Sequence, residues 1–137
     1  MRTLFVFGFL LAGLLSAARP AQAGAELLYF FSHGCEYCEQ WDEEVGIVYG
    51  KTTDAKILPL RRINADNIPP DLAHFNNVHF TPTFIAIKDG REIGRLIGYM
   101  GADFFWQYLA PIVKKAETMM VRRAPEARPD ITAKPRS

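Results

Sequence analysis

The chain has 137 residues, two of them cysteines, and its 16 Lys and Arg nearly balance its 15 Asp and Glu. This length suits one domain with one hydrophobic core. The near-neutral balance argues against nucleic-acid binding, which needs a clustered basic surface. We therefore look for chemistry in a single exported or soluble domain.

Residues 1–23 have the pattern of a secretory signal peptide. Arg2 supplies positive charge, residues 3–18 are nearly all apolar, and residues 21–23 place alanines on both sides of a glutamine. The apolar run is short for a membrane span, which needs about 20 residues, although a retained anchor is the alternative. We expect cleavage before Gly24 and export to an oxidising compartment, which in a bacterium is the periplasm.

Four segments of the remaining chain have the composition of β-strands. They are residues 26–32, 56–64, 83–88 and 91–98. The first is a continuous apolar run, typical of a strand covered on both faces. Pro59 indicates that the second strand begins late or lies at a sheet edge. Asp89 and Gly90 form a two-residue hairpin turn between the last two.

Three segments have the pattern of helices. They are residues 36–49, 71–75 and 102–117. On the first helix, Trp41, Val45 and Val48 share one side, and Gly50 is its expected stop. The last helix carries an apolar stripe at i, i+3, i+4 and i+7 spacing. This stripe consists of Phe105, Tyr108, Leu109 and Ile112.

The resulting order, β-α-β-α-β-β-α, predicts an α/β fold. We expect a four-stranded mixed sheet with helices on both faces, formed by residues 24–117. Residues 118–137 are basic and rich in proline, and we expect them to be a disordered tail.

The two cysteines, Cys35 and Cys38, stand where the first strand ends and the first helix begins. Unpaired N–H groups and partial positive charge at a helix start favour a thiolate, so a C-x-x-C pair there gains redox reactivity. The short spacing lets the second thiol attack a mixed disulfide formed by the first. Two other interpretations stay open: a structural disulfide, and a metal site with His33 as a further ligand.

The order of elements and the motifs resemble the thioredoxin fold. The C-x-x-C pair follows the first strand, and residues 81–83 (Thr-Pro-Thr) stand where thioredoxin-like proteins carry a cis-proline. The resemblance covers residues 26–115. Within this family, the Cys-x-Tyr-Cys site and residues 98–106 look like the small periplasmic thioredoxins of the Sox sulfur-oxidation system.

The resemblance implies roles for four residues. Cys35 would be the exposed nucleophile and Cys38 the buried resolving thiol. Pro82 would be the cis-proline facing the disulfide, and the Thr81 backbone would bind a substrate chain in extended form. We also expect a monomer without cofactor or metal. Its partners would be a client protein with a disulfide or modified cysteine, such as a sulfur carrier, and a membrane thiol donor of the DsbD or CcdA type.

Charges near the dithiol predict the redox direction. Glu36 lies between the cysteines and Glu39 follows them, so like-charge repulsion should raise the pKa of Cys35. A less stabilised thiolate makes the protein reducing, and we therefore predict a reductase. His33 is a second candidate for tuning this pKa. A thiol oxidase or isomerase and a non-catalytic binding module are the alternatives.

The chain also departs from the family pattern. Cytosolic thioredoxins have a buried aspartate six residues before the first cysteine, where this chain has Tyr29. The usual proton acceptor for Cys38 is therefore missing. Gly34 stands where thioredoxins have tryptophan.

We expect a group of aromatic residues to lie in the core, with a docking patch as the alternative. This group is Phe104, Phe105, Trp106 and Tyr108.

Overall fold

The computed structural model describes residues 24–122. Four strands form one mixed sheet in this range. They are β1 (Ala25–Phe31), β2 (Leu60–Asn64), β3 (Thr83–Lys88) and β4 (Arg91–Ile97). Their order is β2-β1-β3-β4, with β1 parallel to β2 and antiparallel to β3, and β3 antiparallel to β4. The sheet confirms the topology predicted from the sequence.

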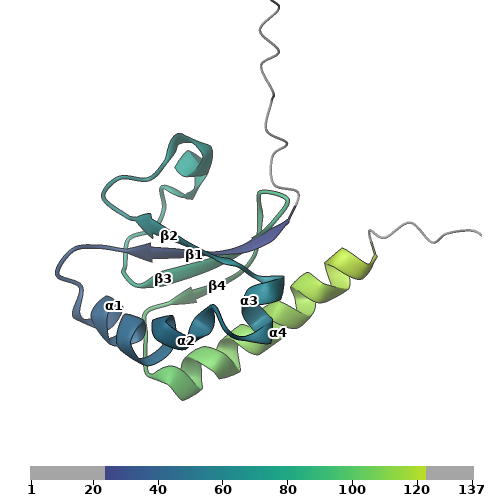
Figure 1. Ribbon diagram of the computed structural model, residues 1–137. Coiled ribbons are helices and arrows are strands. Elements are labelled where there is room, and N and C mark those ends of the chain that lie inside the picture. Colours follow the sequence, from purple (N-terminus) through teal and green to yellow (C-terminus); the bar gives the residue numbers. More distant parts are fainter. Residues whose placement is uncertain (1–23, 123–137) are drawn as a thin grey trace, which may run out of the picture.

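Helices cover both faces of this sheet, but unequally. They are α1 (Glu36–Trp41), the π-helical η1 (Asp42–Gly46), α2 (Ile47–Tyr49), α3 (Thr53–Ile57), the 3₁₀ helix η2 (Pro70–Phe75) and α4 (Ala102–Val121). Helices α1 to α4 lie on one face, and the segment with η2 lies on the other (Figure 1). No helix within residues 24–122 is long and apolar enough to cross a membrane.

Strand β1 supplies the core on both faces, because successive side chains of a strand point to opposite sides. Leu27 and Tyr29 belong to the cluster under α1 to α4, whereas Leu28 and Phe30 belong to the cluster under η2. All four side chains are fully buried. This explains why the first strand is continuously apolar rather than alternating.

The first predicted helix is continuous, but its middle turn is π-helical. Segment η1 joins α1 to α2 with this wider turn, which rotates the residues that follow it. Trp41 and Val45 are buried as expected, but Tyr49 follows them into the core, at 1% exposure. Val48 was predicted on the same side as Trp41 and Val45 but is 40% exposed, so it does not share their buried side.

The second strand is shorter than predicted. The chain forms helix α3, capped by the Thr52 hydroxyl, before β2 begins at Leu60. Pro59 does precede a late start, and β2 does lie at a sheet edge. The apolar pair Ile57 and Leu58 misled the prediction, because a short apolar run fits a buried helix end as well as a strand. Leu58 is fully buried under the helical layer.

Helix α4 runs to Val121, four residues beyond the predicted end at residue 117. Its buried side consists of Phe105, Leu109, Val113 and Ala116. Tyr108 was predicted in this stripe but is 54% exposed, because the i, i+4, i+8 row of the helix faces the sheet instead. The predicted signal peptide and residues 123–137 of the predicted tail lie outside the described residues.

Candidate active site

Cys35 and Cys38 form a disulfide at the start of α1. Cys35 is the N-cap residue, and its carbonyl accepts hydrogen bonds from the backbone N–H groups of Cys38 and Glu39. The Cys38 N–H also lies 3.2 Å from Cys35 Sγ and donates to it. Cys38 is 3% exposed, whereas Cys35 is partly exposed. The pair therefore has one accessible and one buried sulfur.

Gly34 makes the turn that carries the chain from β1 to this helix start. Its φ is +71°, in the left-handed region that favours glycine. A β-carbon there would meet no atom within 4 Å, so the backbone conformation rather than crowding selects glycine. This turn accounts for the glycine at the position where thioredoxins have tryptophan.

The loops that follow β1, precede β3 and follow β4 meet at the same end of the sheet. The Thr81–Pro82 peptide bond is cis, with Pro82 buried and Thr81 half-buried. The hydroxyls of Ser32 and Thr81 are hydrogen-bonded at 2.8 Å, which ties the end of β1 to the start of β3. The Gly98 N–H donates to the Pro82 carbonyl at 2.7 Å, which ties in the end of β4. The predicted substrate-binding loop is thus fixed from both sides.

The two residues predicted to tune Cys35 are both exposed. Glu36 is the first residue of α1. His33 lies edge-on to the Phe31 ring, and its Nε2 is 3.5 Å from Nδ2 of Asn64. Their tuning roles stay predictions. Within residues 24–122, no three His, Cys, Asp or Glu side chains are grouped to hold a metal ion.

Tyr29 stands directly behind Cys38. It is fully buried, and its hydroxyl donates to the Cys38 carbonyl at 3.2 Å. Arg62 of β2 lies over the Tyr29 ring, 4.8 Å from its centroid, and donates two hydrogen bonds, of 2.6 and 2.7 Å, to the carboxylate of Asp42. Burial, and then the charge of Asp42, raise the pKa of Tyr29, and Arg62 opposes this shift.

Sequence reasoning missed this assembly. The sequence marks Tyr29 only as the residue in place of an aspartate and Asp42 only as one of several acids on a helix, and no motif connects Asp42 with Arg62. These two lie 20 residues apart on different elements, and only the register of β2 against β1, which pairs Arg62 with Tyr29, brings them together.

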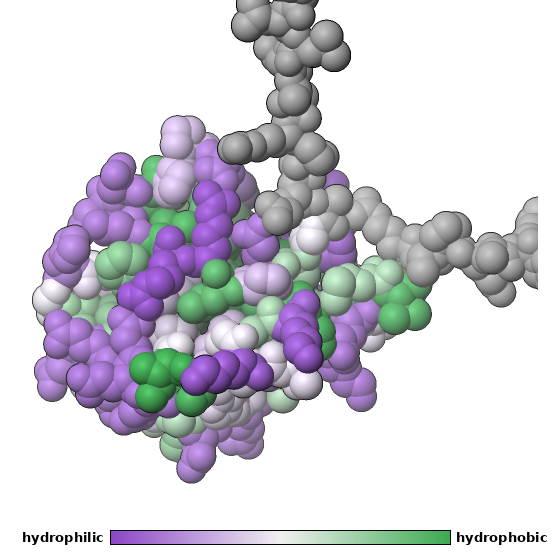
Figure 2. Space-filling view, viewed as in Figure 1, coloured by the Kyte–Doolittle hydropathy of each residue, from purple (hydrophilic) through white to green (hydrophobic). Residues whose placement is uncertain are grey.

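Tyr99 fastens the loop after β4 to the helix that carries the cysteines. Its hydroxyl donates to Glu44 Oε2 at 2.6 Å, and Gln40 Nε2 donates to the other oxygen at 2.9 Å. The hydrogen bond from Tyr99, followed by that from Gln40, lowers the pKa of Glu44. Glu39 and Glu43 of the same helix are exposed. Figure 2, in the same view as Figure 1, shows a mostly hydrophilic surface around α1 with separate hydrophobic patches.

Large apolar side chains are exposed on helix α1 and on the two loops that precede β3 and α4. Tyr37, Phe80 and Met100 are 58%, 69% and 71% exposed. Beside them, a groove of about 270 Å³ lies between the end of β4 and the start of α4. Phe104 and Tyr108 line it and are about half exposed, so their predicted place in the core was wrong. Phe105 is buried and Trp106 partly buried, as expected.

The comparisons with known proteins agree with this geometry. The family model described as a thioredoxin-like domain matches residues 14–112. The periplasmic thioredoxin SoxS from Paracoccus pantotrophus, in its reduced form, is 41% identical, with a TM-score of 0.61 over 67% of this chain and 98% of that chain. A search of the curated proteins finds no match.

Two more distant structures show the fold alone. Thioredoxin from Malassezia sympodialis is 17% identical, with a TM-score of 0.55 over 70% of this chain and 80% of that chain. Thioredoxin f from spinach chloroplast is 16% identical, with a TM-score of 0.52 over 71% of this chain and 80% of that chain. From the family match and the disulfide at the start of α1, we conclude that the chain belongs to the thioredoxin-like family and is a thiol–disulfide oxidoreductase.

Proposed function

We propose that the protein is an exported, periplasmic thiol–disulfide reductase that acts on a client protein carrying a disulfide or a modified cysteine. The observation that carries this proposal is the pairing of a partly exposed Cys35 with a buried Cys38 at the start of α1. The 41% identity to a periplasmic thioredoxin supports the compartment, as does the predicted signal peptide. The resemblance to Sox thioredoxins makes a sulfur-carrier protein the favoured client class.

The reaction is dithiol–disulfide exchange. The Cys35 thiolate attacks a client sulfur, a mixed disulfide forms, and the displaced sulfur leaves with the electron pair of the broken bond. Cys38 then attacks Cys35 Sγ, which releases the client as a thiol and leaves the Cys35–Cys38 disulfide, the state of this structure. Two electrons pass to the client. A membrane thiol carrier of the DsbD or CcdA type is the proposed class of donor that restores the dithiol.

Opposing charges at the helix start set the direction of this exchange. The Cys38 N–H and the partial positive charge of α1 stabilise a Cys35 thiolate. Glu36 and Glu39, both in the first turn, destabilise it. Because a stabilised thiolate favours the reduced protein and so makes it oxidising, these acids favour a reductase.

The reduction potential of the processed protein in defined glutathione or dithiothreitol buffers tests the proposed direction. A value near or below about −230 mV, in the thioredoxin–glutaredoxin range, supports a reductase. A value near about −120 mV, as for DsbA, would reverse the direction. If Cys35 and Cys38 never form a disulfide in these buffers, the reductase is refuted and a non-catalytic binding module is favoured.

Neutralising one acid tests the charge argument separately. Glu36→Gln should raise the potential by about 6–20 mV, because it removes a repulsion of about 0.3–1 kcal/mol between an exposed carboxylate and the Cys35 thiolate and so stabilises the reduced protein. Glu43→Gln is the matched control, since Glu43 is also exposed but lies beyond the first turn of α1. Equal shifts in the two variants would contradict a local effect on Cys35.

A trapping variant tests the client. Cys38→Ser removes the resolving thiol, so Cys35 should remain covalently bound to its client in cells that produce both. Identification of the adduct, and its loss in a Cys35→Ser variant, would give the client directly. A Cys35→Ser protein that keeps full biological function would show that the fold serves as a binding module instead.

A further inference from the structure

The backbone of Cys38 is held from two sides. Its N–H donates to Cys35 Sγ, and its carbonyl accepts from the Tyr29 hydroxyl at 3.2 Å. The same carbonyl also accepts the Asp42 N–H within the helix. The Cys38 carbonyl is therefore hydrogen-bonded both to strand β1 and to its own helix. The hydrogen bond to β1 comes from the Tyr29 side chain.

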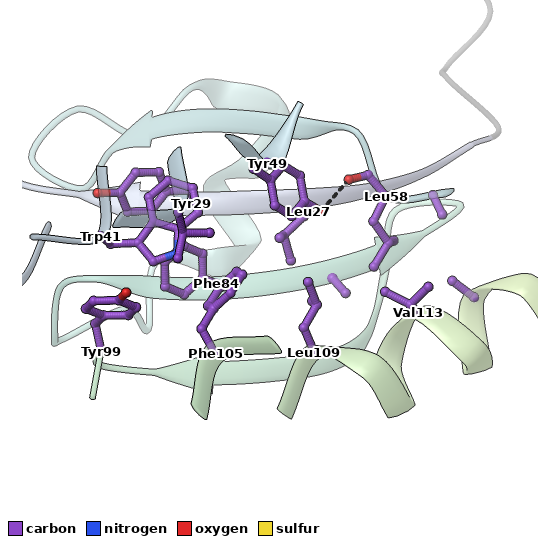
Figure 3. Close-up of a cluster of buried hydrophobic side chains, with 14 of the residues drawn as sticks. Leu27, Tyr29, Trp41, Tyr49, Leu58, Phe84, Tyr99, Phe105, Leu109 and Val113 are labelled. Atoms are coloured by element: carbon purple, nitrogen blue, oxygen red, sulfur yellow. Dashed lines mark hydrogen bonds between the residues drawn. The ribbon is translucent and has the colours of Figure 1, made fainter. Parts of the chain in front are cut away.

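The Tyr29 side chain has little freedom. Its ring stacks on Phe84 of β3, with centroids 4.9 Å apart and planes inclined by 14°, and meets Trp41 at 4.5 Å. Figure 3 shows Tyr29 among these rings in the core. Arg62, fixed by its two bonds to Asp42, covers the ring from β2. These contacts aim the hydroxyl at Cys38.

Tyr29 is also unsuited to accept a proton. Burial raises its pKa, so the phenol stays neutral at physiological pH. The charged groups that act on it are Asp42 and Arg62, which are paired with each other and also lie within hydrogen-bonding reach of the Tyr29 hydroxyl. The other elements in ring contact with Tyr29 contribute only the rings of Trp41 and Phe84. The position of the family's buried carboxylate thus holds a neutral hydrogen-bond donor.

We propose that Tyr29, clamped by Arg62 and Asp42, is a positioning residue for the resolving cysteine: it holds the Cys38 carbonyl, orients the thiol and takes no proton from it. In the resolving step the Cys38 thiol loses its proton to solvent, and its thiolate attacks Cys35 Sγ. The Cys35–Cys38 bond forms, the mixed disulfide breaks, and the client sulfur leaves with the electron pair. The inference rests on the resolving role proposed above for Cys38.

The test uses the reduced, processed protein and 5,5′-dithiobis(2-nitrobenzoate). Attack by Cys35 releases one thionitrobenzoate, and resolution by Cys38 releases a second, whose rate constant is followed by absorbance across pH. Tyr29→Phe should slow the second release about 3- to 10-fold, the worth of one buried hydrogen bond, and leave the first unchanged. Both proteins should show a single ionisation in the second release, that of Cys38.

Tyr49→Phe is the matched control. Tyr49 is equally buried in the same cluster, and its hydroxyl donates to the Leu58 carbonyl at 2.7 Å, a bond drawn in Figure 3. This substitution removes the same kind of bond away from the disulfide, so the second release should keep its wild-type rate. Asp42→Asn loosens the clamp without touching the core and should slow the second release by less than Tyr29→Phe.

Three results would overturn the inference. One is an unchanged second release in Tyr29→Phe, and another is an equal slowing in Tyr49→Phe, which would indicate a general effect on stability. The third is a second ionisation in the wild type that Tyr29→Phe removes, because Tyr29 would then belong to a proton acceptor. A wild-type protein that releases only one thionitrobenzoate would instead refute the resolving role of Cys38, and with it the proposed reductase.

Discussion

Ile112 of α4 packs directly on Gly94 of β4, and Gly94→Ala should therefore destabilise the protein. A β-carbon at this position would lie 2.7, 2.8 and 2.9 Å from Cγ1, Cδ1 and Cγ2 of Ile112. Carbon atoms prefer separations of about 3.5–4.0 Å, so three atoms of one side chain would overlap. Ile112 is β-branched with one strongly preferred rotamer in a helix, so α4 itself must shift.

The expected magnitude is a difference between two effects. Overpacking of this kind costs about 1–3 kcal/mol. Alanine also restricts the unfolded chain, which returns about 0.4–1 kcal/mol. At the middle of both ranges the free energy of unfolding should fall by about 1.3 kcal/mol, and the melting temperature by roughly 5–10 °C for a domain of this size.

Urea denaturation followed by tryptophan fluorescence measures this change. Gly50→Ala is the matched control, because Gly50 has a φ of −61° and a β-carbon there would meet nothing within 4 Å. Its stability should stay the same or rise slightly. A double-mutant cycle with Ile112→Ala should show that Gly94→Ala costs less once the isoleucine is gone. If Gly94→Ala is as stable as Gly50→Ala, the packing argument is refuted.

Two further predictions concern the same core and the hydrogen bond between Tyr99 and Glu44. Phe105→Ala should lower the free energy of unfolding by about 3–5 kcal/mol in urea denaturation, since this buried ring contacts Trp41 and Phe84; a loss below about 1 kcal/mol would contradict its central place. The lowered pKa of Glu44 means that its bond from Tyr99 stabilises the fold fully above the ordinary carboxylate pKa, about 4.3, and loses this effect as pH falls through the lowered value. The free energy of unfolding of Glu44→Gln should therefore depend less on pH in that range than that of the wild type. An identical pH dependence in the two proteins would contradict the stabilising role of the Tyr99–Glu44 hydrogen bond.

Much of the fold could be predicted because local signals agreed with one another. The Asp89-Gly90 turn and the apolar runs beside it indicated β3 and β4, and residue 89 does adopt a φ of +52°. The cysteine spacing indicated where a strand gives way to a helix. The cis-proline was implied only by the resemblance, and the structure confirms it.

The errors arose where tertiary packing overrides local pattern. The π turn in η1 has no periodic signature, so Tyr49 could not be distinguished from Val48 as the third core residue. Phe104 is as apolar as Phe105, and Tyr108 is also aromatic, so the direction of α4 over the sheet decides which ring is buried. Both errors concern which face of a helix meets the sheet, a choice that hydrophobicity alone leaves open.

Tyr29, at the position of the family's buried carboxylate, both packs in the core and donates a hydrogen bond to Cys38, so it bears on stability and on the proposed resolving step. A carboxylate behind Cys38 would have to be desolvated, at a cost in stability, although it could accept a proton. Tyr29 instead adds a ring to the aromatic cluster and keeps only a neutral donor toward Cys38. With the tuning role proposed for Glu36 and Glu39, the ionisable groups that act on the dithiol lie at its exposed side, in the first turn of α1. It follows that substitutions there should change the potential, whereas Tyr29→Phe should change the rate of resolution.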